Sequence, residues 1–517
     1  PTTLLSSAAS DVYKRQDPDT DSAIEETCFA CHSANGGGTL SNAGEVPDIE
    51  TDFQMARRMP IVTGDQRANR EVHDILDADF TEDPNNMGRN NVNNRHAECT
   101  DCHNPHRVVK RRSFTQTNAN GNMDPEGTHT HQNGTTHTNI ASGVLRGTWG
   151  VEPDYGGNQN FHVDPSGFTV KRGEPTSTNT GVGMDWVTRE YQVCLKCHSN
   201  YAFGNGYNGP PPLGGAGLTP PGTNAMTRYT NIAREYNSPD SHRGEGQNLG
   251  QEGGAGGAWD TNNHRSWHPV MQPTGRTTGV RGAAMDNWLA PFRSIGTQTM
   301  YCTDCHGSDT ANGTVVPGGS QPNGPVWGPH GSDNNFLLKG QWDNATGVGQ
   351  QDDLCFKCHD YNDYAGTAGG NSGFSTGGMG CGGMCGGGGM GGMNNMNNLH
   401  SFHVNAVTNF RCNLCHVAVP HGWKNKNFLV NLNDVGQEST NGDSGQVRNN
   451  TTAGYFNGPY YNRATLKVIN FAASSTWVAN NCGSVGAPGN GQVGVNWMAG
   501  GGGGMGGGAS EACANVP

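Results

Sequence analysis

The chain has 517 residues, of which 80 are glycine, and only 15% are charged and 32% hydrophobic. A chain this poor in apolar side chains cannot readily offset the conformational entropy of folding by side-chain burial alone. Its formal net charge of −13, without a basic patch interleaved with aromatic residues, argues against nucleic acid as a partner. No apolar stretch of the sequence reaches the length of a transmembrane helix.

Residues 1–23 form an N-terminal tail. The stretch SSAASDVYKRQ within residues 1–16 resembles translated adapter sequence, so we treat residues 1–16 as non-native and exclude them from the fold prediction. No signal peptide is visible in this tail.

Six copies of Cys-x-x-Cys-His follow along the chain and use twelve of its 16 cysteines. We number these motifs one to six in chain order. Their cysteines are Cys28 and Cys31, Cys99 and Cys102, Cys194 and Cys197, Cys302 and Cys305, Cys355 and Cys358, and Cys412 and Cys415. The histidines that end them are His32, His103, His198, His306, His359 and His416.

This pattern is typical of c-type haem attachment. Two thiols three positions apart can bond the two vinyl groups of one porphyrin, and the adjacent histidine then supplies the proximal ligand to the iron. A zinc site or a thioredoxin-like redox pair is the alternative, but neither needs a histidine directly after every second cysteine. The sequence therefore predicts six haem c groups.

Six haems would supply the apolar surface that the side chains lack. We therefore expect a multihaem cytochrome c fold, with mostly irregular coil and short helices wrapped around a chain of haems. Helices are expected around the motifs, most clearly over REYQVCLKC (189–197). A small β-rich C-terminal tail is expected from the strand-like segments KNFLVNL (426–432) and TLKVINFAA (465–473).

The motifs fall into three pairs, which suggests three dihaem units: unit A at 24–180, unit B at 181–345 and unit C at 346–425. Each unit repeats the order motif, isolated histidine, motif, isolated histidine, and CTDCH occurs in both A and B. Unit C also contains a Gly/Met-rich insert at 366–398, which is typical of a flexible linker. The β-rich and Gly-rich tail covers 426–517.

The fourteen histidines outside the motifs suffice to give every iron a second, distal imidazole. Our predicted distal ligands are His73, His106, His268, His330, His403 and His421, with His96 and His400 as substitutes. His106 lies three residues after His103, too close to reach the opposite face of its own haem, so it would bind a neighbouring one. Surface roles are expected for the histidines in polar surroundings, namely His129, His131, His137, His162, His242 and His264.

Methionine is the alternative axial ligand and would raise the reduction potential. However, five of the 16 methionines lie between Met379 and Met396, in a Gly-rich segment that we judge too loose to position a ligand. The sequence therefore favours low-spin, low-potential haems with two histidine ligands each.

Four cysteines lie outside the motifs: Cys381, Cys385, Cys482 and Cys513. In an oxidising compartment we expect disulfides, with Cys482 joined to Cys513 and Cys381 to Cys385. A copper(I) site formed by these thiols and nearby methionines is the alternative.

Several strings resemble extracellular multihaem c-type cytochromes of metal-respiring bacteria, a group that includes filament-forming (nanowire) cytochromes. They are ECTDCHNPHR (98–107), YCTDCHGSD (301–309), GPHGS (328–332) and LCFKCHD (354–360), and the resemblance covers roughly residues 24–435. It implies closely spaced bis-histidine haems and electron delivery to acceptors outside the cell, such as metal oxides or other cells. The Gly/Met-rich insert and the tail depart from that group.

The predicted function is electron transfer rather than catalysis, at the cell surface or outside the cell, with the periplasm as the alternative location. Expected partners are other cytochromes and further copies of the chain in a filament. The alternative is a multihaem reductase of a small inorganic oxyanion or nitrogen compound, which needs an open axial position at one iron. No CxxCK variant of the motif is present, which weighs against that alternative. A third class is a redox-storage or adhesive surface protein whose Gly-rich segments mediate contacts.

Overall fold

The computed structural model describes about a third of the chain, spread over all six motifs. The described residues are 23–34, 47–54, 72–73, 75, 97–108, 137–156, 164–177, 179–203, 232–236, 266–275, 277, 287–294, 296–317, 326–334, 337–341, 350–365, 372, 398, 400–401, 412, 416, 421–423 and 426–428.

Helices in these ranges are short, and the longest has seven residues. The α-helices are α2 (Ala23–Phe29), α3 (Glu50–Gln54), α4 (Cys99–Cys102), α5 (Glu190–Cys194), α6 (Asn200–Phe203), α7 (Ile232–Glu235) and α10 (Tyr361–Tyr364). The 3₁₀ helices are η4 (Gly143–Leu145), η8 (Cys302–Asp304), η10 (Leu354–Lys357) and η13 (Lys426–Phe428). The expected mixture of coil and short helices therefore describes this part of the chain, and the helix predicted within 189–197 is present as α5.

Two small antiparallel pairs make up the strands. Strand β1 (Gly150–Asp154) pairs with β2 (Gly167–Lys171), with Gly150 opposite Lys171. Strand β3 (Ser266–Trp267) pairs with β4 (Gly422–Trp423), with Trp267 opposite Gly422. The second pair joins segments more than 150 residues apart, so it fixes the tertiary arrangement rather than a local hairpin.

The expected C-terminal β structure is not seen where the chain is described. Residues 426–428, at the start of the predicted strand 426–432, form η13, in which Asn427 and Phe428 have φ angles of 54° and 56°. Such left-handed backbone interrupts an extended strand. The rest of that segment, and 465–473, lie outside the described residues.

The main apolar cluster lies around motifs three to five. It contains Val151, Tyr191, Leu195, Trp267 and Met300, and the motif cysteines Cys302, Cys305 and Cys358 pack against it. The thiols of these motifs therefore lie against the best-packed part of the protein.

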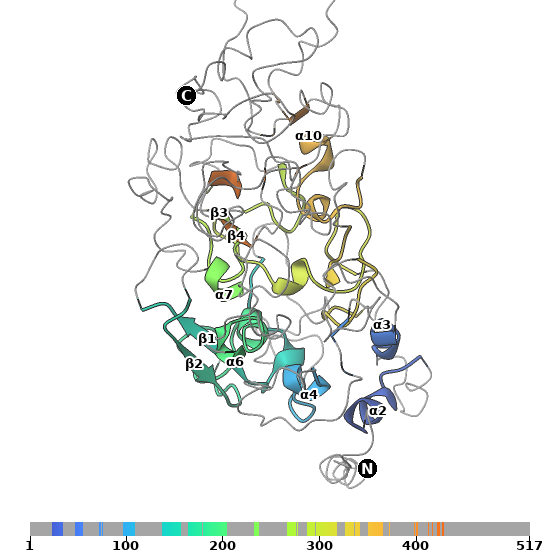
Figure 1. Cartoon of the computed structure of the whole chain (residues 1–517), viewed down its shortest axis with the longest axis vertical. Helices are drawn as coiled ribbons and strands as arrows, with labels where there is room; N and C mark the ends of the chain where they lie inside the picture. The colour runs from blue at the N-terminus through green and yellow to red at the C-terminus, as the bar shows by residue number, and fades with distance from the viewer. Residues whose placement is uncertain are drawn as a thin grey trace, which may run out of the picture.

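The described elements are spread along the long axis of the molecule (Figure 1). Helices α2 and α4 lie toward the N-terminal end, α3 lies level with the β1–β2 hairpin and α6, and α10 lies toward the opposite end. No helix in the described part is long and apolar enough to span a membrane.

Candidate haem-binding sites

Each of the six motifs folds into the same single turn. In every one, the backbone N–H of the histidine donates to the carbonyl oxygen of the first cysteine, over N–O distances of 2.8 to 3.0 Å. This turn brings both thiols and the imidazole to one side of the backbone. None of the eleven motif cysteines in the described ranges is joined in a disulfide there, and Cys415 lies outside those ranges. The thiols are therefore available for thioether bonds.

Five motif histidines face a second histidine from outside their own motif. The ring centroids are 6.1 Å apart for His73 and His198, 6.3 Å for His103 and His330, 6.4 Å for His268 and His359, and 6.2 Å for both His306 with His421 and His400 with His416. Two imidazoles on opposite sides of one metal, each with a metal–nitrogen bond of about 2 Å, have centroids roughly 6 Å apart. All five pairs therefore have the spacing of two axial ligands.

Five of these imidazoles are in the chemical state that a metal requires. Burial lowers the pKa of His198 and of His330 to about 3, and it also lowers the pKa of His73, His103 and His416. The rings are therefore neutral near pH 7, as ligands must be.

Hydrogen bonds at Nδ1 leave the other ring nitrogen for the metal. The Nδ1 atoms of His73, His103 and His416 donate to the carbonyl oxygens of Pro329, Val144 and Asn427 at 2.6, 2.9 and 2.8 Å. The Nδ1 of His421 bonds the Glu235 carboxylate. Such contacts orient metal-binding histidines and fix their tautomer.

The predicted distal ligands have different outcomes. His73, His268, His330 and His421 each face a motif histidine. The place opposite His416 is taken by the substitute His400, while His403 and His96 lie outside the described residues. His106 is exposed, and its ring pairs with no motif histidine among the described residues.

Motif one differs from the other five. The Nδ1 of His32 bonds the carbonyl oxygen of Pro47 at 3.3 Å, and burial lowers its pKa. Among the described residues, no second histidine ring is paired with His32. A distal ligand for motif one is therefore not assigned within those ranges.

The pairs cross between the three units. His73 of unit A faces motif three of unit B, and His330 of unit B faces motif two of unit A. Likewise His268 of unit B faces motif five of unit C, and His421 faces motif four of unit B. Sequence spacing could not reveal this exchange, because it depends on contacts between segments about 90 or more residues apart.

Two backbone contacts, which we call histidine clips, hold the exchanged residues side by side. In the first clip Val72 bridges Gly331, and the N–H of His73 donates to the carbonyl oxygen of His330 at 3.2 Å. In the second clip β3 pairs with β4, and the N–H of His268 donates to His421 at 3.1 Å. Each clip therefore positions two imidazoles that serve two different motifs.

The motifs also contact one another through their first cysteines. Side-chain hydrogen bonds join Cys28 to Cys99, Cys194 to Cys302 and Cys355 to Cys412, and these contacts, followed by burial, raise the pKa of Cys99, Cys302 and Cys355. Motif one is thus beside two, three beside four, and five beside six.

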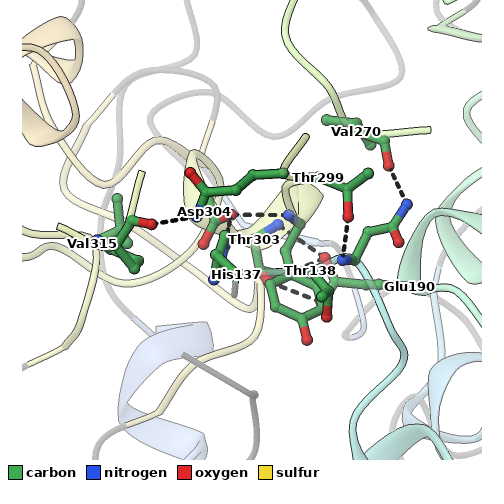
Figure 2. A network of polar contacts seen from close by, with 12 residues as sticks. His137, Thr138, Glu190, Val270, Thr299, Thr303, Asp304 and Val315 are labelled. Atoms are coloured by element: carbon green, nitrogen blue, oxygen red, sulfur yellow. Dashed lines mark hydrogen bonds and ion pairs between the residues drawn. The ribbon is translucent and has the colours of Figure 1, made fainter. Parts of the chain in front are cut away.

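His137 corrects the sequence prediction of a surface role. Only 1% of this residue is exposed, and its Nε2 lies 2.8 Å from Oδ2 of Asp304, inside motif four (Figure 2). Its ring packs edge-on against Phe292 and Tyr301. The polar residues beside His137 in sequence carry no signal of this burial, because residues 292–304 provide it.

Comparison with known proteins supports haem binding. The family model described as doubled CXXCH motif matches residues 296–363, which include motifs four and five. This match indicates a multihaem c-type cytochrome. No curated protein and no solved structure matches the chain. The thiols and neutral paired imidazoles described above fit the covalent haem that such a cytochrome carries. Among the described residues of the chain, no cluster of three or more metal-binding side chains occurs.

Proposed function

We propose that this cytochrome carries electrons through a continuous chain of six bis-histidine c-type haems. Each motif would hold one haem by its two thiols and its histidine. For motifs two to six, the distal ligands would be His330, His73, His421, His268 and His400, in that order. When bound, the haems supply reversible one-electron chemistry at iron.

The observation that carries this proposal is the unbroken series of contacts between successive motifs. Cysteine contacts join one to two, three to four and five to six. Lys196 of motif three binds the carbonyl oxygen of Asp101 in motif two, and Cys305 of motif four lies close enough to Cys358 of motif five to raise its pKa. Groups attached at these motifs would therefore lie next to one another in chain order.

Paired imidazoles favour electron transfer over catalysis. An iron with a histidine on each side has no position for a substrate, and five motifs have such a pair. The protein's part is to hold each imidazole, exclude water by burial and keep the ring neutral.

A multihaem reductase is the second candidate, and the observation that favours it is at motif one. If His32 had no distal partner in the folded protein, its iron could take a small oxyanion or nitrogen compound. The reaction would then occur at one end of the chain of motifs, with the other five supplying electrons.

An extracellular location and assembly into filaments are part of the proposal. They are supported by the resemblance of the motif strings to extracellular cytochromes. Unit A adds a structural reason, because His106 is exposed and His32 has no paired histidine among the described residues. A histidine from a second copy would complete motif one, and metal oxides or other cells would then accept the electrons.

Spectroscopy of the native holoprotein tests the electron-transfer proposal. We expect mass spectrometry to show six covalent haems and low-temperature electron paramagnetic resonance to show low-spin iron. Carbon monoxide added to the reduced protein should bind no haem, or motif one alone if that site is open. Carbon monoxide binding at two or more haems would contradict the proposal.

Microscopy and surface labelling test the remaining part. Electron microscopy of the native protein should show filaments, and protease added to intact cells should remove the haem-containing protein. Protection from protease in intact cells, with loss only after the outer envelope is opened, would place the protein in the periplasm instead.

A further inference from the structure

The residue directly before the second cysteine alternates in charge along the four inner motifs. It is Asp101 in motif two, Lys196 in three, Asp304 in four and Lys357 in five. The same position is uncharged in the two outer motifs, which have Ala30 and Leu414. The structure brings these charges together in two places, between motifs two and three (the first junction) and between motifs four and five (the second junction).

The lysine of the first junction is almost completely buried. Lys196 is 1% exposed, its Nζ donates to the carbonyl oxygen of Asp101, and it lies 4.5 Å from the centre of the Trp149 ring. Burial raises the pKa of the neighbouring Cys102 thiol to about 12, while the Lys196 ammonium lowers it and the Asp101 carboxylate raises it. Both charges therefore act directly on a thiol that would carry a porphyrin.

The lysine of the second junction is buried in the same way. Lys357 is 1% exposed, and its Nζ donates to the carbonyl oxygens of Thr310 and Ala311 at 2.7 and 3.0 Å. Burial has the largest effect on the pKa of the Cys358 thiol and raises it. The Asp304 carboxylate also raises this pKa, while Lys339 and Lys357 lower it. The ammonium groups of Lys196 and Lys357 thus both donate to backbone carbonyl oxygens.

Further charges surround Asp304. Figure 2 shows His137 directed at this carboxylate and Glu190 at Thr303, whose hydroxyl and N–H both donate to the Glu190 carboxylate. Lys339 is also buried, and its Nζ donates to the carbonyl oxygen of Val315 at 2.6 Å. Because motif four has charges of both signs around it, the lysines of motifs three and five give the cleaner test.

The inference rests on the proposed haem sites. One-electron reduction makes a haem iron less positive by one charge, and no other reactant is needed. A buried cation beside the porphyrin therefore favours the reduced state, and a buried anion favours the oxidised state. In a low-dielectric interior these effects are much stronger than at the surface. We propose that the two buried junction lysines raise the reduction potentials of the haems beside them, Lys196 at the first junction and Lys357 at the second, and that the aspartates Asp101 and Asp304 lower them.

The consequence for conduction is that each buried lysine would make the reduced state of the haems at its own junction more favourable. The aspartates also have a structural role, because each accepts a hydrogen bond from the N–H of the residue before its motif.

Optical redox titration of the full-length holoprotein tests the proposal. In Lys196→Gln and in Lys357→Gln, the potential of one haem should fall. We expect at least a tenfold lower reduction equilibrium constant at that haem, which is about 59 mV for one electron. Lys196→Arg should keep the wild-type titration curve, since it retains the charge.

Arg172→Gln is the matched control. Its guanidinium lies 5.0 Å from the centre of the same Trp149 ring as Lys196, but the residue is exposed. The substitution removes the same charge where solvent screens it, so we expect a much smaller shift. An equal shift in Arg172→Gln and Lys196→Gln would overturn the proposal, because net charge alone would then explain it.

Haem counting separates this inference from the proposed function. If wild type has six low-spin haems and both lysine variants titrate as wild type does, the inferred effect of the lysines on the potentials is wrong and the chain of haems stands. If Lys196→Gln loses haem, two other variants test the proposal instead. Lys357→Gln should lower the reduction potential of one haem, and Asp101→Asn should raise the reduction potential of one haem. Unchanged or opposite shifts in those two variants would overturn the inference.

Discussion

The two junctions are built from the same parts but differ in how deeply they bury their acidic residue. Each joins a CTDCH motif to a motif with lysine before its second cysteine, and each is accompanied by a histidine clip. In the first junction Asp101 is partly exposed. In the second, Asp304 is fully buried and bonded to His137, and Lys339 is buried nearby. The histidine clips are therefore the shared framework, and the polar surroundings of the aspartate are what varies.

The comparison also shows that the chain repeats in two overlapping registers. The cysteine contacts pair the motifs as one with two, three with four and five with six. The clips and charged residues instead pair two with three and four with five. The doubled-motif family match covers motifs four and five, which is the second register. Each of motifs two to five thus belongs to two kinds of pair, and this makes the series continuous.

The largest expected effect comes from removing one clipped histidine at each junction. In His73→Ala and in His268→Ala, one haem should lose an axial ligand, become high-spin and bind carbon monoxide when reduced. His268→Met is the matched variant, since a methionine ligand should restore six-coordination and raise that potential. Six low-spin haems in both alanine variants would show that the paired rings are not the ligands.

The second largest effect is expected from replacing His137, whose hydrogen bond to Asp304 distinguishes the second junction from the first. His137→Phe keeps a ring against Phe292 and Tyr301 but removes the hydrogen bond to the buried Asp304 carboxylate. We expect the free energy of unfolding to fall by about 1.5–3 kcal/mol. Chemical denaturation of the holoprotein measures this. Asp304→Asn should then be less costly in the His137→Phe background than in wild type, and equal costs would mean that the two side chains are not coupled.

A third prediction concerns what the junctions share. Gly331 and Gly422 directly follow the clipped residues His330 and His421, and a Cβ added there would lie only 2.1 and 2.0 Å from the carbonyl oxygens of Asp52 and Glu235. Gly331→Ala and Gly422→Ala should each destabilise the protein by about 1–3 kcal/mol, because backbone must move apart. Thermal unfolding gives the measurement. Gly167→Ala, where a Cβ meets nothing within 4 Å, is the control and should have little effect.

The smallest effect is a pH dependence specific to the second junction. Burial lowers the pKa of Lys339 from 10.5 to about 8. The unfolded chain therefore binds the proton more tightly, so this lysine makes the folded state more stable as pH rises from about 8 to 10.5, and that gain is lost as pH falls through 8. The melting temperature of Lys339→Met should rise less than that of wild type over this window. Parallel curves for the two proteins would contradict the prediction.

Much of the site could be predicted from local sequence. The Cys-x-x-Cys-His spacing dictates a single turn that presents two thiols and an imidazole, and all six motifs form it. Helix α5 was predictable because it lies on a motif. The predicted strand at 426–432 was wrong over 426–428, because apolar content alone does not exclude left-handed backbone at Asn427 and Phe428. The predicted cysteine pairings among Cys381, Cys385, Cys482 and Cys513 lie outside the described residues and stay predictions.

The sequence by itself determined the kind of chemistry, the number of motifs and a set of histidines that could serve as second ligands. Those features depend on residue type and on spacings of a few residues. Over so short a stretch of chain, covalent geometry decides which side chains can meet. Only the tertiary structure decided which histidine faces which motif, that the units exchange them, and that His137 is buried. Most of these outcomes depend on contacts between residues about 90 to 260 positions apart, where no short-range rule of backbone or side-chain geometry applies.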